Sequence, residues 1–470
     1  MKKIFCLIIA LLLYCYIAGG VPVFAEGEFT SAYNLTYEVF ESGNTRATYN
    51  VGLTNQTTNF YAAEYTLTLA TTKVQNILAF DKKGKLGASI DKKEGQTIIH
   101  LVFNDKVVGK DQTLNFTLSY ETNEIAQKNG RVWEVNIPKR GEDPSISDYT
   151  VTLKVPKSFP PAAYFLPTPS TPFTWKKDQL TGGVRAAFGD FQVFNFELTY
   201  DLANPNFYPV YMEVALPPDT PYQKISLSQV SPPPVNVRVD KDGNWLARFN
   251  LSPGQKLTVI VQGLAQIFLQ SQKSYPLTSD DLKPYLVPQK YWEANDPQIK
   301  DLAKKLKTPK EIYNFVVSTL SYDYEKARRG GKRLGAKETL KNPTASICME
   351  FTDLFIALSR AAGIPTREID GFAYTANPRL RPLAEELDIL HTWPQYWDSQ
   401  KKAWIMVDPT WGSTSQTDYF ENLDFNHFAF AIKGYDSERP APAGSYKLPP
   451  EKKNVKVNFA TQDLKEESRW

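Results

Sequence analysis

The chain has 470 residues, a formal net charge of +3 and 22% charged residues, with only three cysteines and three histidines. No basic stripe stands out, so electrostatics give no support to nucleic-acid binding. A chain of this length is expected to form roughly two to four domains.

The first 25 residues have the pattern of a secretory signal peptide. Lys2 and Lys3 precede an apolar run, which ends at the small-x-small sequence Val23-Phe24-Ala25. We expect cleavage after Ala25; the alternative is an anchor, because the apolar run is near the length that spans a bilayer. No later segment has that length and character. The prediction is therefore an extracytoplasmic protein: secreted, periplasmic or at the cell surface.

The next part of the chain has the alternation of half-buried antiparallel strands. Segments such as "NLTYEVF", "ATYNVGL" and "TLNFTLSY" alternate apolar and polar residues, with turn residues between them. We expect a β-sandwich domain over residues 26–128 and a second all-β region over residues 129–272. In the latter, Asp242-Gly243 predicts a hairpin turn. A calcium loop there lacks the required glycine and distal glutamate.

Apolar residues at helical spacing appear only after about residue 280. The segment "DPQIKDLAKKLKTPKEIYNFVVSTLSYDY" has apolar residues on one helical face, with Thr308 as a candidate N-cap before Pro309. Strands followed by helices favour separate β and α+β domains. We expect the α+β domain over residues 273–436 and a C-terminal tail over residues 437–470.

Cys348 is the one cysteine outside the signal segment, which contains Cys6 and Cys15. No internal disulfide is then possible, and a lone thiol is either buried and inert or a nucleophile. Apolar residues at helical spacing from Phe351 to Gly363 place Cys348 in the first turn of a helix. A helix N-terminus stabilises a thiolate, and a backbone N–H there can donate to an oxyanion. Position alone leaves both interpretations open.

A thiol nucleophile needs a base, and His391 is the best-placed histidine. It begins "HTWPQYWDSQKKAWIMVDPTW", which has the pattern of a hairpin. With the turn centred between Ser399 and Gln400, His391 lies opposite Asp408 on the same sheet face. A carboxylate in that position orients the imidazole and stabilises its cation. We interpret His100 and His427 as structural, and no metal site is expected.

The stretches "CMEFTDLFIALSRAAGIPTR", "GFAY", "HTW" and "WIMVDPTW" strongly resemble the transglutaminase-like superfamily. The resemblance covers roughly 277–434, a third of the chain. It implies a papain-like α+β core with a Cys-His-Asp triad, in which Cys348 is the nucleophile, His391 the base and Asp408 the orienting acid. Two positions depart from the family pattern: Ser346 replaces a glycine, and Gln395 replaces an acidic residue. A tryptophan upstream of the cysteine, an oxyanion donor in animal transglutaminases, is also missing.

Together, the residues and the resemblance predict an extracytoplasmic thiol acyl-transfer enzyme acting on amide bonds without a cofactor. It would be a cysteine peptidase or amidase, or a transglutaminase or deamidase, with a protein or peptide substrate. The alternative is a non-catalytic surface protein that binds a partner through its β domains. The substrate, the acyl acceptor and the oligomeric state are left open.

Overall fold

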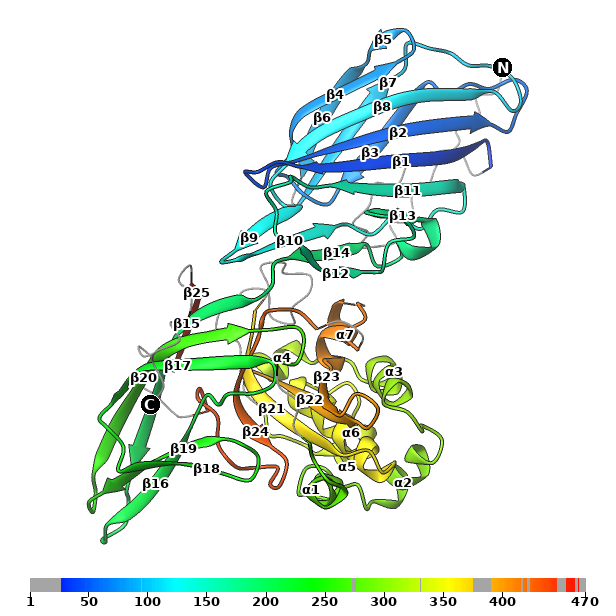
Figure 1. Cartoon of the computed structure of the whole chain (residues 1–470). Helices are drawn as coiled ribbons and strands as arrows, with labels where there is room; N and C mark the ends of the chain where they lie inside the picture. Colours follow the sequence, from blue (N-terminus) through cyan, green and yellow to red (C-terminus); the bar gives the residue numbers. More distant parts are fainter. Residues whose placement is uncertain are drawn as a thin grey trace, which may run out of the picture. The chain divides into compact units, whose positions relative to one another are not determined.

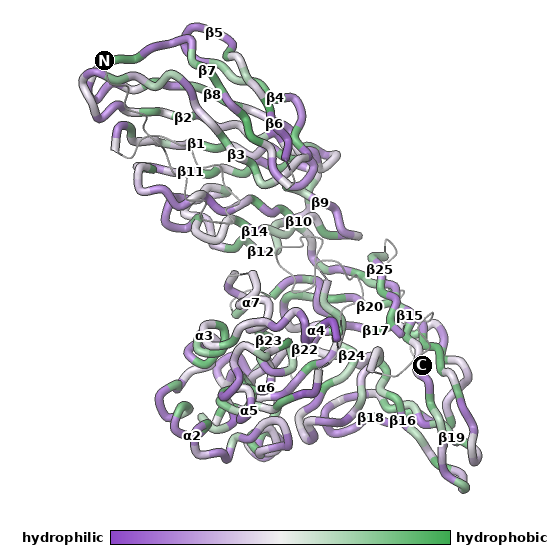
Figure 2. Tube along the Cα trace, turned by 180° about the vertical axis from the view of Figure 1, so that it is seen from behind, coloured by the Kyte–Doolittle hydropathy of each residue, from purple (hydrophilic) through white to green (hydrophobic). Residues whose placement is uncertain are grey.

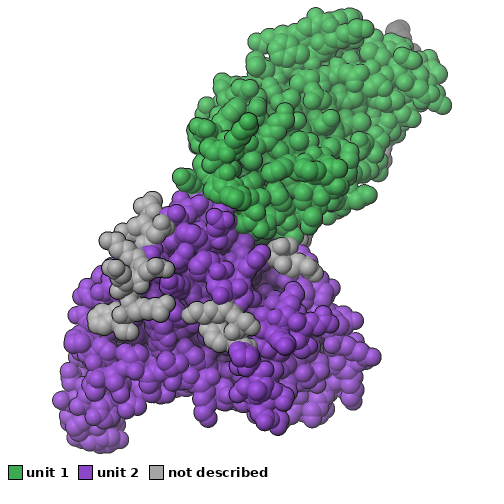
Figure 3. All heavy atoms as spheres, in the orientation of Figure 1, with its two compact units in different colours: residues 1–128, 133–188 green, residues 129–132, 189–470 purple. Residues whose placement is uncertain are grey.

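The structure is a computed structural model that describes residues 27–93, 95–272, 276–329, 331–374, 390–415, 417–420, 423–445, 454–460 and 464. The proposed signal peptide and residues 375–389 lie outside the described residues. The chain divides into two compact units (Figure 1, Figure 3). Unit 1 comprises residues 1–128 and 133–188, and unit 2 comprises residues 129–132 and 189–470.

Unit 1 is built from three sheets around one hydrophobic core. Its strands alternate buried and exposed positions, as the sequence predicted, and Figure 2 shows polar and apolar segments mixed along them. The largest sheet has, in spatial order, β13 (Thr174–Lys176), β11 (Ile146–Lys154), β1 (Phe29–Val39), β2 (Thr45–Asn55), β8 (Thr113–Thr122), β4 (Gln75–Asp81) and β5 (Gly84–Lys85).

Two smaller sheets contribute side chains to the same core. One contains β3 (Glu64–Leu69), β7 (Gln96–Val102) and β6 (Gly87–Lys93); the other contains β12 (Ala162–Leu166), β14 (Val184–Phe188), β10 (Val132–Ile137) and β9 (Ala126–Asn129). The hydroxyl groups of Tyr33 on β1 and Tyr65 on β3 lie 3.3 Å apart, which shows the layers in contact. The only helical turn described between 29 and 201 is Lys177–Gln179, so the all-β prediction is confirmed.

Unit 2 combines two further antiparallel sheets with the α+β part of the chain. The first sheet contains β17 (Gln223–Ser231), β20 (Lys256–Ile267), β15 (Gln192–Ala203) and β25 (Val455–Phe459). The second contains β16 (Val210–Leu216), β19 (Trp245–Leu251) and β18 (Asn236–Val239). The hairpin predicted at Asp242-Gly243 joins β18 to β19.

The α+β part has a central antiparallel sheet in the order β23 (Ala403–Met406), β22 (Leu390–Asp398), β21 (Thr366–Ala373) and β24 (His427–Lys433). Helix α6 packs against β22 and β21. The helices are α1 (Ser279–Leu282), α2 (Pro297–Ala303), α3 (Pro309–Thr319), α4 (Tyr324–Arg329), α5 (Ala336–Lys341), α6 (Cys348–Ala361) and α7 (Pro409–Ser415), with a 3-10 turn at Lys283–Leu286. Together with the sheets that precede it, this part confirms the predicted fold class.

The start of α3 shows how the sequence sets a helix end. The Thr308 hydroxyl accepts the Glu311 N–H at 3.2 Å, and the Glu311 carboxylate accepts the Thr308 N–H at 2.9 Å. Thr308 is the N-cap and Pro309 the first helical residue, as the sequence predicted; the reciprocal bond from Glu311 completes a capping box.

The two compact units do not coincide with the predicted domain ranges. Unit 1 extends past 128 to Phe188, apart from the short segment 129–132, so the predicted second all-β region is split between the units. The predicted tail supplies β25, which pairs with β15. Within unit 2, Phe194 and Phe196 of β15 share a core with Phe428 and Phe430 of β24. The β sheets of unit 2 therefore form part of the support for the α+β sheet.

Side-chain amides also join the β sheets of unit 2 to β24. The Gln223 amide donates to the Ala429 carbonyl at 2.9 Å and accepts the Ala429 N–H at 2.9 Å. Asn244 makes the same reciprocal pair with Ile432, both at 2.7 Å. Each amide satisfies both polar groups of a buried residue, which would otherwise lack partners.

Gly371 on β21 is predicted to be a position where any side chain destabilises unit 2. An added Cβ would lie 2.1 Å from the Phe428 carbonyl oxygen and 2.8 Å from the Trp393 ring. We expect Gly371→Ala to lower the free energy of unfolding by about 1–3 kcal/mol, as overpacking does. Thermal unfolding tests this, with Gly87→Ala as control because no atom lies within 4 Å of its added Cβ. Equal unfolding midpoints for the two variants would contradict the prediction.

Candidate active site

Cys348 is the first residue of α6, as the sequence predicted. It is partly exposed, whereas most of the helix behind it is buried. The Ile347 carbonyl accepts the N–H groups of Glu350 and Phe351, and the Glu350 carboxylate accepts the Ile347 N–H. The Cys348 N–H has no hydrogen-bond partner among the described residues. Because the first N–H groups of a helix are unpaired, this donor is available to a bound group.

His391 is on β22, and its Nε2 lies 2.7 Å from Asp408 Oδ2. The Cys348 side chain lies close enough to the same imidazole to help raise its pKa. Since Nε2 faces the carboxylate, Nδ1 is the nitrogen left for the thiol. The structure thus brings Cys348, His391 and Asp408 into one chain of contacts, although their catalytic role remains a prediction.

The hairpin register differs from the one used to predict this contact. Asp398 pairs with Ala403 and Trp397 with Trp404, so the turn centre lies between Gln400 and Lys401. The ladder shifts by two positions from the predicted pairing, and it ends at Met406, before Asp408. A shift of two preserves which face each residue occupies, because side chains alternate with period two. The predicted neighbours therefore meet, although the predicted opposition was wrong.

Asp408 is held by the start of α7 rather than by a strand. Its Oδ1 accepts the Trp411 N–H at 2.9 Å, as an N-cap side chain does, and Pro409 occupies the first helical position. Asp408 is completely buried, which by itself would raise its pKa. The positive charge of His391 and its hydrogen bond outweigh burial and hold the pKa of Asp408 far below its usual value. The carboxylate is therefore ionised at neutral pH.

The electrostatics of His391 follow from the same pair. Burial disfavours the imidazolium, but the Asp408 charge and hydrogen bond outweigh it and raise the pKa of His391 to about 9. Contact with Cys348 adds to this increase. Trp393 and Trp411 pack around the ring, with centroids 5.9 and 5.8 Å from that of His391. These tryptophans therefore pack against the His391 ring.

His427 is closer to the site than the sequence indicated. Its Nε2 lies 3.2 Å from Asp408 Oδ2, the oxygen that also contacts His391. Its Nδ1 lies 2.8 Å from Asp424 Oδ1. His427 is thus a buried, hydrogen-bonded histidine, as interpreted, but it also contacts the orienting acid. Asp424 and His427 are three residues apart in the sequence, and nothing in that spacing places them beside Asp408.

Tyr322 is a second residue that sequence reasoning missed. Burial raises its pKa, and the nearby charges of Cys348 and Asp408 add to the effect. Tyr322 forms a β-bridge with Ser346, the residue that replaces the family glycine two positions before Cys348. The Ser346 hydroxyl donates to the Pro343 carbonyl at 3.1 Å. Ser346 therefore helps to form the turn that precedes α6.

Gln395, the other departure from the family pattern, faces Arg367 across the β21–β22 ladder. Its side-chain oxygen accepts the Arg367 Nε–H at 2.8 Å. Burial lowers the pKa of Arg367, and its guanidinium lies over the Trp404 ring, 4.3 Å from the centroid. A neutral amide thus serves as the hydrogen-bond partner of a buried arginine, which is a structural role.

Among the described residues, one group has donor atoms close enough together to surround a metal ion: His391, Asp408 and His427. Hydrogen bonds already account for its geometry. Both Nε2 atoms already face one oxygen, Asp408 Oδ2, at hydrogen-bond distances of 2.7 and 3.2 Å. The N–H groups of both imidazoles, donating to Asp408 Oδ2, explain why the three side chains lie together.

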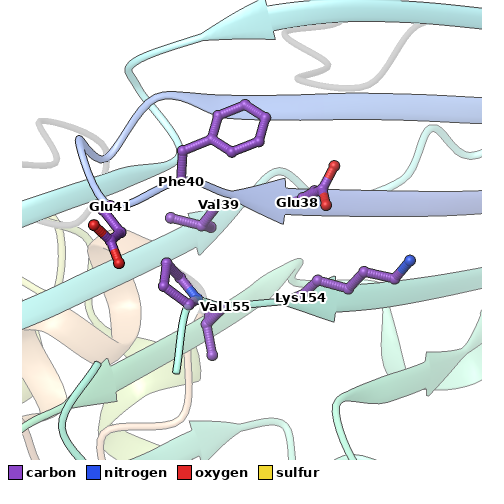
Figure 4. Close-up of a pocket in the computed structure, with 7 residues that line it drawn as sticks. Glu38, Val39, Phe40, Glu41, Lys154 and Val155 are labelled. Carbon is purple, nitrogen blue, oxygen red and sulfur yellow. The ribbon is translucent and has the colours of Figure 1, made fainter. Parts of the chain in front are cut away.

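A surface pocket lies in unit 1 between the ends of β1 and β11 (Figure 4). Glu38 and Lys154, which pair across the two strands, form part of its lining. The triad residues belong to unit 2. His100 is also in unit 1, on β7, where its Nδ1 lies 2.8 Å from the Thr66 hydroxyl.

The two histidines of the site make stability depend on pH. Their pKa values of about 9 exceed the ordinary 6.5, so the folded state holds these protons more tightly. This contribution is complete below about pH 6.5 and is lost as pH rises through 9.

We expect the free energy of unfolding to fall between these values by a few kcal/mol, and by less in His427→Gln. Urea unfolding of both proteins and of His100→Gln, which should behave as wild type, checks this. An equal fall in all three would contradict it.

Comparisons with known proteins are consistent with this geometry. A family model described as the transglutaminase-like superfamily matches residues 294–409. That range includes Cys348, His391 and Asp408. No curated protein matches the sequence. The chain carries a transglutaminase-like domain, as its motifs predicted.

Solved structures similar to this chain include a "putative cysteine protease" from Cytophaga hutchinsonii. It is 17% identical, with 59% of this chain and 93% of that chain covered and a TM-score of 0.41. Another is the periplasmic domain of TgpA from Pseudomonas aeruginosa, which is 16% identical, with 48% and 92% covered and a TM-score of 0.27. These values are too low to carry an argument about activity, so the proposal below rests on the site.

Proposed function

We propose that the protein is a thiol acyl-transfer enzyme that acts on amide bonds of protein or peptide substrates. The observation that carries the proposal is the chain of contacts from Cys348, at the start of α6, through His391 to the ionised carboxylate of Asp408. A thiol beside an imidazole that is oriented by a carboxylate is the arrangement of nucleophilic catalysis. Either cysteine peptidase or transglutaminase chemistry fits this site.

The reaction would proceed in two steps. Cys348 Sγ attacks the amide carbonyl carbon, and its proton is held on His391 Nδ1. When the C–N bond breaks, that proton passes to the departing amine, which leaves a thioester on Cys348. Water then gives hydrolysis, or a second amine gives transamidation; His391 takes a proton from either one and returns it to the sulfur. Asp408 keeps the ring oriented throughout.

An oxyanion forms in each step and needs a donor. The N–H of Cys348 meets this need because it has no hydrogen-bond partner among the described residues and lies at the positive end of α6. The proposal assigns it that role. It requires the carbonyl oxygen of the substrate to point toward the start of α6 when the carbon faces Sγ.

The proposal places the reaction outside the cytoplasm, because residues 1–25 have the pattern of a signal peptide. No helix in the described part of the chain is long and apolar enough to cross a bilayer. The partners proposed are protein or peptide substrates.

The competing proposal is a non-catalytic surface protein, supported by the large share of β structure. The reactivity of Cys348 separates the two, since an ion-paired thiolate is alkylated rapidly and a buried inert thiol is not. We expect iodoacetamide to label Cys348 faster near pH 6 than it labels the same residue in His391→Gln. Mass spectrometry of the Cys348 peptide measures both rates. Slow labelling that is the same in both proteins would favour the scaffold.

The activity itself is tested by a screen of peptide amides and glutamine-containing peptides with purified protein. Release of ammonia or of a new amino terminus, absent with Cys348→Ala, is the expected result. Added primary amines should divert part of the product if transamidation occurs. Turnover that is the same in wild type and in Cys348→Ala would refute the proposed function.

A further inference from the structure

His427 is a completely buried imidazole with a carboxylate oxygen at each ring nitrogen. Nδ1 lies 2.8 Å from Asp424 Oδ1, and Nε2 lies 3.2 Å from Asp408 Oδ2. A neutral imidazole has one N–H group and one acceptor nitrogen, and an ionised carboxylate only accepts. Two ionised carboxylate partners therefore require both nitrogens to be protonated. With both carboxylates ionised, these contacts make His427 an imidazolium.

The same carboxylate oxygen serves both histidines of the site. Asp408 Oδ2 accepts from His391 at 2.7 Å and from His427 at 3.2 Å, while Oδ1 accepts the Trp411 N–H. The two imidazole rings have centroids 5.8 Å apart. They come from β22 and β24, the strands on either side of β21. Asp408 is thus fixed by three donors from three elements, and His427 is the one donor that lies outside the triad and carries charge.

Resting on the function proposed above, we propose that His427 is a positioning residue: a fixed cation, clamped by Asp424, that orients Asp408 and weakens the hold of His391 on its proton. A cation beside Asp408 competes with His391 for the carboxylate charge. In the reaction, His391 must both take and release a proton, so an excessively stable imidazolium slows the steps in which it acts as acid. His427 would thereby set the upper pH limit of activity.

The charges around the site support this role. The carboxylates of Asp424 and Asp408 outweigh burial and raise the pKa of His427 to about 9. The other titratable groups that face the cluster are Cys348 at the start of α6, Tyr322 before α4 and Tyr313 on α3. These three are neutral or anionic. Among the described residues of the cluster, His427 is therefore the only cation besides His391.

His427→Gln is the informative substitution, because the glutamine amide can still donate to Asp408 but carries no charge. Loss of the cation should raise the pKa of His391 and move the alkaline limb of the kcat/KM profile up by about 1–2 pH units. Asp424→Asn removes the matching anion. The double variant Asp424→Asn/His427→Gln should move the limb back part of the way. His100→Gln, in unit 1, should leave the limb unchanged.

A purely structural His427 predicts something else: lower stability or lower kcat, with the alkaline limb unmoved. That outcome in a folded His427→Gln protein would overturn the inference. Thermal unfolding establishes that each variant is folded before its profile is measured. The direction of the shift is a further test. Removal of a positive charge should raise the pKa of His391, so an alkaline limb that moves to lower pH would contradict the inference.

A second measurement does not need turnover. The chain has three histidines, so ¹⁵N labelling of histidine gives three imidazole spin systems, with His100→Gln available for assignment. We expect both ring nitrogens of His427 to be protonated at pH 7 in the wild-type protein. A neutral His427 at pH 7 would overturn the inference. If His427 is protonated and no substrate is turned over, the acyl-transfer proposal has failed instead.

Discussion

Replacement of Cys348 by alanine is expected to abolish detectable turnover. The substitution removes the atom that forms the thioester, and the other cysteines of the chain, Cys6 and Cys15, lie in the segment read as a signal peptide. What survives is binding and oxyanion stabilisation, which act without a nucleophile. The assay is turnover of any substrate found, with His100→Ala as a control that should retain full activity.

The fold should not change in Cys348→Ala, because the thiol is partly exposed and alanine is a good helix former. The thermal unfolding midpoint should therefore stay close to that of the wild-type protein. Activity at the wild-type level in Cys348→Ala would show that the thiol mechanism is wrong.

His391→Ala is expected to be nearly as severe, since it removes both the base and the imidazolium that pairs with the thiolate. Asp408→Asn should be milder, because the acid acts through the histidine; the loss of an orienting carboxylate alone costs on the order of 10⁴ in rate. The effects should not add in the Cys348→Ala/His391→Ala double variant, because the residues act as one unit. Single-turnover rates for the three single variants and the double variant give the comparison.

Two results would contradict this order of severity among the substitutions. If a folded His427→Ala protein is as inactive as His391→Ala, then His427, and not His391, is the catalytic base. Full additivity of the Cys348 and His391 effects would also contradict the account, because it would mean that the two residues act independently.

The sequence predicted the parts of the fold that depend on local pattern. Strand alternation gave the all-β character of unit 1, and Thr308 with Pro309 gave the start of α3. Apolar spacing placed Cys348 at the start of α6. These features depend on a few neighbouring residues, whose physical preferences can be seen directly in the sequence.

The candidate site was predicted only in part. His391 and Asp408 were paired from an assumed turn, but the true register is two positions away and the ladder ends before Asp408. Asp408 is actually fixed as the N-cap of α7, an interaction that the pattern Asp408-Pro409 could have indicated.

The remaining features depend on tertiary contacts. His427 joins the site because β24 pairs with β21 on the side opposite β22. Likewise, β25 pairs with β15 across more than 250 residues of sequence. Strand order of this kind brings distant segments together, and local periodicity carries no information about it. The boundary between the units was misplaced for the same reason, since strands on both sides of residue 128 share one core.

The central claim is that Cys348 carries the acyl group, and trapping of that intermediate tests it most directly. Wild-type protein in turnover with an amide substrate is quenched in acid, digested and mapped by mass spectrometry. We expect an acyl group on the peptide that contains Cys348, released by hydroxylamine and absent from Cys348→Ala, with a higher yield when Asp408→Asn slows the second step more than the first. Steady turnover with no acyl group on Cys348 in any of these proteins, or with the acyl group on another residue, would contradict the account.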